Sequence, residues 1–184
     1  TARFNSFASP TPVIEEGRVY VHFGSYGTAA LDTKTGKTLW QRRDLPCNHW
    51  RGPGSSPMLH GERLFVHFDG YDQQYAVALD KRTGRTLWKS VRAHDYGTDD
   101  GDMKKAGGRS QLISQAAKAV FSLDPATGAE LWRVRYDSHS AATRVLAANG
   151  LLYVGTGRGP SELLAIRPDG KGDVTGTHVV WRAG

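Results

Sequence analysis

Residues whose side chains could do chemistry are concentrated in a few polar stretches of this sequence. The stretch "DLPCNHWRGPG" (residues 44–54) places an imidazole, an indole and a guanidinium in a row at His49, Trp50 and Arg51. Such a triplet could stack on a ligand and hold a carboxylate, a phosphate or an anionic sugar. The same residues could instead fill a gap between elements or form a salt bridge to a loop. With similar side chains from later stretches, the candidate ligand-binding residues are His49, Trp50, Arg51, Lys104, His139 and Arg144.

Acidic clusters offer only weak candidates for metal binding. The stretch "DYGTDDGD" (residues 95–102) supplies the oxygen ligands that hard cations prefer, but it lacks the regular calcium-loop spacing and a distal glutamate. A second stretch, "DGKGDVTG" (residues 169–176), has two aspartates four positions apart, as many glycine-rich hairpin turns do. We therefore predict no metal site, and the weak candidates are Asp99, Asp100 and Asp102.

No catalytic group is predicted from the remaining reactive side chains. His139 lies close in sequence to Asp137 and two serines, but a catalytic triad requires spatial geometry, and no G-x-S-x-G motif is present. His22 and His67 occupy matching positions in two repeats, which indicates packing more than metal binding. Cys47 is the only cysteine, so an internal disulfide is excluded, and we expect a buried, inert thiol.

Composition limits the broad class of the protein. The chain has 184 residues, 39% of them hydrophobic, which is enough for a sizeable core. No apolar run reaches the roughly 18 residues of a transmembrane helix, and no signal peptide is visible. The net charge of +6 comes from scattered basic residues, without a dense tract or a nucleic-acid-binding motif. We therefore expect no specific nucleic-acid partner.

The elements that must position these residues are given by an internal repeat. The stretches "LDTKTGKTLW", "LDKRTGRTLW" and "LDPATGAELW" share one pattern. Their three tryptophans and a fourth one in the last unit are spaced by 48, 44 and 49 residues. Periods of this size are typical of radially repeated architectures. The runs at residues 17–24, 62–70 and 150–157 are strand-like and bounded by glycine.

Each unit is predicted to form four short strands with a tight turn before the last one. The first unit divides into strands at residues 9–15, 18–23, 28–33 and 37–43. The aspartate accepts hydrogen bonds in the turn, the glycine supplies a left-handed backbone, and the tryptophan docks one sheet on the next. These structural repeat residues are Asp32, Gly36, Trp40, Asp80, Gly84, Trp88, Asp124, Gly128, Trp132 and Trp181.

These repeats resemble the tryptophan-docking repeats of the pyrroloquinoline-quinone-type (PQQ-type) β-propellers. That WD40-like superfamily includes quinoprotein alcohol dehydrogenases and the propeller lipoprotein of outer-membrane protein assembly. The stretches "DLPCNHWRGPGSSP" and "LLAIRPDGKGDVTGTHVVW" are similar to bacterial, planctomycete-like PQQ-binding-like repeat proteins. The resemblance implies an all-β propeller, or part of one, of about four antiparallel blades, and a location that is periplasmic or otherwise exported. We expect a single domain over residues 1–184, with blades at about 7–43, 55–91, 107–135 and 142–182.

Two departures from the resembling group bear on the fold. The third unit offers only "AGGRS" where a first strand should stand, so we predict an incomplete third blade with residues missing near Ala106 and Gly107. The resembling proteins also carry about twice as many repeats. We therefore favour a fragment completed by the remaining blades of a larger propeller, with a four-bladed ring or a ring of two chains as alternatives.

The expected function follows from the propeller. Interblade loops share one face with the loops joining strands two and three, so the candidate ligand-binding residues gather there, and loops on a rigid scaffold usually carry function. We expect a non-enzymatic binding module for a protein or a small anionic ligand, without a cofactor. The alternatives are a PQQ-dependent dehydrogenase and the sensor domain of a signalling protein. The single cysteine argues against the dehydrogenase, because the resemblance implies an adjacent cysteine pair and a calcium set.

Overall fold

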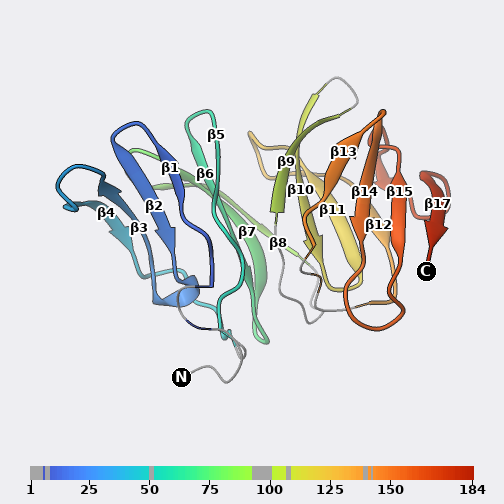
Figure 1. The fold of residues 1–184 in the computed structure, drawn as a ribbon, viewed down its shortest axis with the longest axis horizontal. Helices are drawn as coiled ribbons and strands as arrows, with labels where there is room; N and C mark the ends of the chain where they lie inside the picture. The colour runs from blue at the N-terminus through green and yellow to red at the C-terminus, as the bar shows by residue number, and fades with distance from the viewer. Residues whose placement is uncertain are drawn as a thin grey trace. The chain divides into compact units, whose positions relative to one another are not determined.

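In the computed structural model, the regular secondary structure is almost entirely antiparallel β-strand (Figure 1). It describes residues 6, 9–49, 52–92, 109–138, 141 and 143–184, and the backbone of residues 101–106. The only helical element in these ranges is the 3-10 turn η1 (Gly24–Tyr26). No helix in the described part of the chain has the length and apolar character needed to cross a membrane. Two compact units divide the chain, Thr1–His94 and Asp95–Gly184.

The first unit contains two four-stranded sheets, which we call blades 1 and 2. In both, the spatial order of the strands follows the sequence. Blade 1 consists of β1 (Val13–Glu15), β2 (Arg18–His22), β3 (Thr28–Asp32) and β4 (Thr38–Arg42). Blade 2 consists of β5 (Met58–His60), β6 (Arg63–Asp69), β7 (Gln74–Asp80) and β8 (Thr86–Val91). The four strands predicted for the first repeat are therefore present, but the first is shorter than predicted, because it begins at Val13 and not at residue 9.

The second unit contains blades 3 and 4. Blade 3 consists of β9 (Gly101–Ala106), β10 (Arg109–Ala116), β11 (Ala119–Leu123) and β12 (Glu130–Arg135), with β16 (Gly172–Asp173) added in parallel to the outer edge of β12. Blade 4 consists of β13 (Leu146–Ala148), β14 (Leu151–Gly155), β15 (Leu163–Ile166) and β17 (Val179–Ala183). The predicted single domain over residues 1–184 stays a prediction.

The prediction of an incomplete third blade is wrong. Residues 101–106 form β9, which pairs antiparallel with β10 from Ala106 opposite Arg109 to Gly101 opposite Ser114. The polar sequence "GDMKKA" has no apolar alternation, so it gave no strand signal, yet its backbone completes the ladder. We predicted that this blade begins at residue 107, but its first strand already begins at Gly101. The break predicted near Ala106 and Gly107 falls on residues 107–108, outside the described residues.

The repeated turn is closed by its aspartate and its glycine. Asp32 Oδ1 accepts hydrogen bonds from the backbone N–H groups of Lys34 (3.0 Å) and Thr35 (2.7 Å), and Asp80 does the same for the turn of blade 2. Asp124 repeats the arrangement in blade 3. The turn glycines have left-handed φ angles of 69° at Gly36 and 72° at Gly84. An aspartate and a glycine therefore close each turn by local interactions alone.

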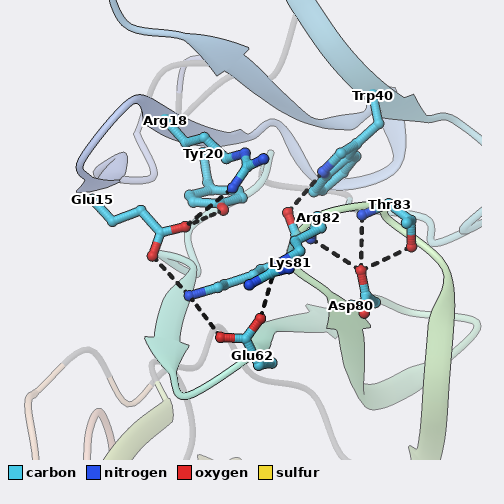
Figure 2. A network of polar contacts seen from close by, with 9 residues as sticks. All are labelled: Glu15, Arg18, Tyr20, Trp40, Glu62, Asp80, Lys81, Arg82 and Thr83. Carbon is cyan, nitrogen blue, oxygen red and sulfur yellow. Dashed lines mark hydrogen bonds and ion pairs between the residues drawn. The ribbon is translucent and has the colours of Figure 1, made fainter.

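Trp40 docks blade 1 on blade 2 (Figure 2). Its indole Nε1 donates a hydrogen bond of 2.9 Å to the carbonyl oxygen of Lys81 in the blade 2 turn. The ring also covers Gly84, where a Cβ would lie 2.6 Å from Trp40 Cε3. Around it, Lys81 Nζ bridges Glu15 (2.9 Å) from blade 1 and Glu62 (3.3 Å) from its own blade. An apolar core with a polar rim therefore joins the two sheets.

Trp132 docks blade 3 on blade 4 in a related way. Its fully buried indole Nε1 lies 3.1 Å from the carbonyl oxygen of Pro168 and 2.8 Å from Gln111 Oε1. Gln111 also donates to Pro168 (3.0 Å) and accepts from the Ser122 hydroxyl (2.5 Å). In each unit, one indole therefore donates a hydrogen bond to a backbone carbonyl oxygen of the next sheet's unit of the repeat, and Gln111, which gave no sequence signal, joins the second of these contacts. Trp181 in blade 4 is 41% exposed.

Candidate functional site

Three connections of the first unit come together at one end of blades 1 and 2. They are the interblade segment in its described parts, residues 43–49 and 52–57, the β2–β3 connection with η1, and the β6–β7 connection at residues 70–73. A Cβ at Gly24 would lie 2.5 Å from His49 Nε2, and one at Gly70 would lie 2.5 Å from Cys47 Sγ. The glycines thus let both strand connections pack against the interblade segment. We call this end of the first unit the loop face.

His49 is half-buried within the loop face. Its Nδ1 lies 3.8 Å from Cys47 Sγ, and its ring centroid lies 6.1 Å from that of Phe68 in β6. Burial lowers the pKa of His49, so the imidazole is neutral at neutral pH. A neutral, packed ring suits the gap-filling interpretation of His49. A ligand-binding role for this residue remains a prediction.

The Cys47 thiol is poorly suited to nucleophilic chemistry. It is buried and donates a long hydrogen bond of 3.7 Å to the carbonyl oxygen of Gln73. Burial raises the pKa of Cys47 to about 12, and the negative charges of Asp69 and Asp72 act in the same direction. The thiolate is the reactive form of cysteine, so this thiol stays protonated and unreactive at neutral pH.

A buried ion pair joins Asp69 at the end of β6 to Arg92, which directly follows β8. Both side chains are almost completely shielded from water. The Arg92 backbone N–H also donates to the carbonyl oxygen of Gln74 (2.8 Å), which fixes the end of β8 against β7. Breaking a buried pair leaves an uncompensated charge, so this contact holds the loop face to the sheet. Sequence analysis missed the pair, because its members are 23 residues apart and neither belongs to the repeated motif.

The two matched histidines lie in the core beneath the loop face. His22 Nδ1 lies 2.8 Å from the Thr28 hydroxyl, and the His22 ring meets Phe68 edge-on at 5.0 Å. His67 is completely buried, and in the described structure neither of its ring nitrogens has a hydrogen-bond partner. Burial lowers the pKa of both histidines, to about 3 for His22. Both rings are therefore neutral packing groups at neutral pH, as their matching positions suggested.

Two tyrosines stand exposed on the loop face above these packed groups. Tyr26 in η1 is 60% exposed, and Tyr71 in the β6–β7 connection is 49% exposed. The segment carrying Tyr71 is held firmly, because its backbone N–H donates to the Asn48 carbonyl oxygen (3.1 Å). The Asn48 N–H in turn donates to Asp72 Oδ1 (2.7 Å). Sequence analysis did not single out these tyrosines, although both occupy the same connection in successive blades.

The remaining predicted site residues are only partly visible. Arg144 is exposed just before β13 in the second unit, so it belongs to a different unit from His49. The backbones at Lys104 and Asp102 lie in β9. Five other candidates fall outside the described residues, namely Trp50, Arg51, His139, Asp99 and Asp100. His49 is thus the one candidate that the structure places within the described loop face.

In the glycine-rich stretch at residues 169–176, both aspartate carboxylates contact other protein groups. Asp173 Oδ2 forms an ion pair of 2.7 Å with Arg135 Nε, and its Oδ1 accepts from the Thr175 hydroxyl (2.6 Å). These hydrogen bonds, from Thr175 first and then Arg135, lower the pKa of Asp173 to about 2. Asp169 Oδ1 lies 3.6 Å from His178 Nε2. Over the described ranges, no group of three or more His, Cys, Asp or Glu residues is arranged to hold a metal ion.

Comparison with known families now places the chain. A family model described as outer membrane protein assembly factor BamB matches residues 1–106 and, in a second register, residues 72–174. The chain belongs to this family. The two overlapping matches reflect the internal repeat, and the BamB family thus confirms the PQQ-like propeller resemblance. No curated protein sequence matches the chain significantly.

Solved structures agree with the BamB-family fold. BamB from Moraxella catarrhalis superposes with a TM-score of 0.67 at 19% identity, over 94% of this chain and 50% of that one. A quinohemoprotein alcohol dehydrogenase from Pseudomonas putida HK5 gives 0.66 at 15% identity, over 94% and 34%. The corresponding enzyme from Comamonas testosteroni gives 0.63 at 13% identity, over 87% and 33%. The chain spans a third to a half of these proteins, and such low identities establish the fold alone.

Proposed function

We propose that this chain is a non-enzymatic binding module of the BamB family that presents its loop face to a protein partner. The observation that carries the proposal is the pair of exposed tyrosines, Tyr26 and Tyr71, on a face whose loops are already fixed. Tyrosine is enriched at protein interfaces because it brings a large apolar ring and a hydroxyl with few rotatable bonds. Loops that are ordered before binding lose little further entropy when a partner docks.

The charge of the chain supports an acidic partner surface. The formal net charge is +6, and Arg43 is exposed where the interblade segment of the first unit begins. Basic side chains around an apolar patch speed association with an acidic surface and orient it. The same charges would attract a small carboxylate or phosphate ligand, which is the second candidate occupant of this face.

A PQQ-dependent dehydrogenase is the alternative function, favoured by the likeness to two quinohemoprotein alcohol dehydrogenases. The residues of the described loop face do not fit that chemistry. The only cysteine of the chain is Cys47, whose protonated thiol contacts His49 and not a second cysteine. We derive no catalytic step for this chain. A role as the sensor domain of a longer signalling protein would use the same loop face.

An extracytoplasmic location is part of the proposal. The family description names an outer membrane protein assembly factor, and the described residues form a β-scaffold of the kind used outside the cytoplasm by that family. A partner in the cell envelope would suit both this location and the loop face. Fractionation of cells that produce the intact protein, followed by immunoblotting, tests the location directly.

Partner capture tests the loop face. The whole chain is immobilised and exposed to an envelope extract of the source organism, alongside a Tyr26→Ser, Tyr71→Ser double variant and a Lys34→Ser control. Lys34 is exposed in the tight turn of blade 1, away from the loop face. We expect the wild type and the control to retain the same proteins and the double variant to lose them. Equal retention by all three chains would contradict the proposal.

Cofactor loading separates the binding function from the enzymatic one. The chain is incubated with PQQ and calcium, desalted, and examined for the quinone absorbance and for dye-linked alcohol oxidation. We expect neither bound quinone nor turnover. Bound quinone with turnover would replace the proposed function by the dehydrogenase alternative, whatever the capture experiment shows.

A further inference from the structure

His49 is the point at which the connections of the loop face meet. Its half-buried ring lies against Phe68 of β6, and its Nδ1 lies 3.8 Å from Cys47 Sγ. On the other side, a Cβ added at Gly24 would lie 2.5 Å from His49 Nε2 and 2.8 Å from Pro53 Cβ. One imidazole therefore contacts its own interblade segment, the end of β6 and the β2–β3 connection.

A second imidazole lies at the foot of the same β2–β3 connection. His22 ends β2 and Thr28 begins β3, and His22 Nδ1 lies 2.8 Å from the Thr28 hydroxyl. The His22 ring is 2% exposed and meets Phe68 edge-on, with the ring centroids 5.0 Å apart. Two imidazoles thus pack on one phenyl ring, next to the connection that carries η1 and Tyr26.

Both imidazoles have a buried nitrogen that makes no hydrogen bond. The Nε2 atoms of His22 and His49 are shielded from water, and the described residues offer neither atom a hydrogen-bond partner. Burial lowers the pKa of both histidines, and the nearby His49 ring lowers that of His22 further. The backbone of Asp69 and the negative charge of Asp72 favour protonated His49, but burial outweighs them. The closed loop face therefore resists protonation of either ring.

The carboxylates near these rings already have partners. Asp69 forms the buried ion pair with Arg92, and Asp72 Oδ1 accepts the Asn48 N–H (2.7 Å). A proton on His22 or on His49 would thus add a buried charge, and protons on both rings would repel each other. In the part of the chain that the structure describes, the titratable and charged groups that face the two rings are Cys47, His67, Asp69, Asp72 and Arg92.

The β2–β3 connection is built so that it can move as one piece. It is closed by hydrogen bonds from the Phe23 N–H to the Gly27 carbonyl oxygen (2.8 Å) and from the Gly27 N–H to the Gly24 carbonyl oxygen (3.1 Å). Gly24 and Gly27 bound η1 with φ angles of 59° and 148°. Residues at the ends of a loop absorb backbone rotation when it moves, and glycine does so without steric cost. The connection can therefore separate from His49, together with Tyr26, and keep its internal hydrogen bonds.

We propose that mild acid opens the loop face, because proton uptake by His49 and His22 draws their rings out of the packed connections and into water. The η1 connection with Tyr26 then separates from the interblade segment, while the sheets of blades 1 and 2 stay folded. The inference rests on the proposed function in one respect, since it concerns the regulation of the same face. A partner that is bound at neutral pH is released in acid.

The direction of the pH dependence follows from proton binding. A histidine in water has a pKa of about 6.5, whereas both rings have lower pKa values in the closed face. The open face therefore binds more protons, and its population grows as the pH falls below about 6.5. From about pH 7.5 to 5.5, one released histidine raises the open population by up to about 10-fold, and two raise it by up to about 100-fold.

The thiol of Cys47 reports the opening. It is the only cysteine of the chain, it is 7% exposed, and it contacts His49. Its rate of reaction with dithiodipyridine, which modifies thiols in acid and at neutral pH, is measured for the whole chain and divided by the rate for the same chain in concentrated urea. We expect this normalised rate to rise by more than about 10-fold from about pH 7.5 to 5.5. A constant normalised rate would overturn the proposal.

Small additions of urea separate local opening from global unfolding. Global unfolding exposes a large surface and becomes steeply more favourable with urea, whereas the opening of one face exposes little surface. At about pH 5.5 the labelling rate should therefore hardly change at urea concentrations well below the unfolding midpoint. A steep increase with urea would assign the labelling to global unfolding and would also overturn the proposal.

Removal of one titrating ring at a time tests the two histidines. His49→Leu keeps an apolar side chain on Phe68 and should reduce the rise in labelling by about 5-fold or more. His22→Leu should reduce the rise to a similar extent, although it also loses the Thr28 contact. The control is His60→Gln, because His60 is exposed, and it should leave the rise unchanged. The readout is a ratio of rates at two pH values, so a variant that is open at both still gives a smaller rise. An unchanged rise in both leucine variants would contradict the assignment.

Partner capture at two pH values tests whether the opening regulates binding. Envelope proteins that the wild type retains at about pH 7.5 should be lost at about pH 5.5, and the His49→Leu chain should keep more of them in acid. Full retention by the wild type at the lower pH would overturn the regulation. If no protein is captured at either pH, the proposed function fails, and the thiol labelling alone decides whether the face opens.

Discussion

At the scale of single residues, the tryptophans occupy equivalent positions of the repeat but do not contribute the same free energy to folding. Trp40 buries its ring against Gly84 and hydrogen-bonds the carbonyl oxygen of Lys81, whereas Trp181 remains 41% exposed. The free energy that a repeat residue contributes therefore depends on the neighbouring blade and not on the residue type alone. This difference can be measured.

Replacing Trp40 by alanine should destabilise the chain by about 3–5 kcal/mol, the usual cost of removing a buried aromatic side chain. The substitution also leaves the Lys81 carbonyl oxygen without its indole donor. Leu39 is the matched control, since it precedes Trp40 in β4 and is exposed, so Leu39→Ala should cost less than about 1 kcal/mol. Urea unfolding of both variants gives the two values, and similar losses would show that Trp40 does not anchor the blades.

The buried histidines predict a loss of stability in acid. Burial lowers the pKa of His22 to about 3 and that of His67 in the same direction, with Arg92 and then His22 acting further on His67. Below about pH 6.5 the unfolded chain then binds more protons than the folded one, so stability rises with pH and is lost as the pH falls from 6.5 towards 3. Each histidine contributes up to about 1.4 kcal/mol per pH unit in that window.

The His67→Leu variant tests this pH dependence. Neither ring nitrogen of His67 has a hydrogen-bond partner in the described structure, so an apolar residue of similar size should cost less than about 1.5 kcal/mol at pH 7. Its unfolding free energy should fall less steeply between pH 6.5 and 5 than that of the wild type. The control is His60→Gln, because His60 is exposed, and an unchanged slope in both variants would refute the argument.

At the scale of the element, two identical turns meet different surroundings. The turns of blades 1 and 2 share their aspartate hydrogen bonds and the left-handed glycine, but only Gly84 lies under an indole. This pair separates the cost of backbone strain from the cost of steric conflict, which are otherwise measured together.

Gly36→Ala and Gly84→Ala should both lose about 1 kcal/mol, because an L-residue is strained at a left-handed φ. Gly84→Ala should lose about 1–3 kcal/mol more, because its methyl group would lie 2.6 Å from the Trp40 ring. The comparison is made by urea unfolding of both variants and the wild type. Equal losses would indicate that the indole shifts away without cost.

The sequence predicted those elements whose stabilising contacts are local. Asp32, its turn amides and Gly36 lie within five residues, and Trp40 follows at a fixed spacing. The strands and the turn that joins the last two of them could therefore be predicted from the sequence. β9 could not be predicted from the sequence, because "GDMKKA" becomes a strand only through its pairing with β10. The Asp69–Arg92 pair and the Gln111–Trp132 contact were missed for the same reason, since they join residues far apart in the chain.

At the scale of the whole molecule, the candidate site was predicted less completely than the fold. The topology of a propeller correctly brought His49 to the connections that gather at one end of the blades. It could not show that Cys47 would be deprived of reactivity by burial, or that Tyr26 and Tyr71 would be the exposed side chains. Exposure and pKa depend on neighbours from other strands, which local spacing does not specify.

The short strand β16 has a consequence for the behaviour of the chain in concentrated solution. It occupies the outer edge of β12 through Trp132–Gly172 and Arg133–Asp173 pairing, so that rim of blade 3 offers no open ladder to other molecules. Among the residues that the structure describes, no further strand pairs with the outer strands of the other blades, which carry Arg42, Lys89 and Arg182. Positively charged side chains on edge strands repel those of a second molecule, so they oppose edge-to-edge strand pairing and fibril formation.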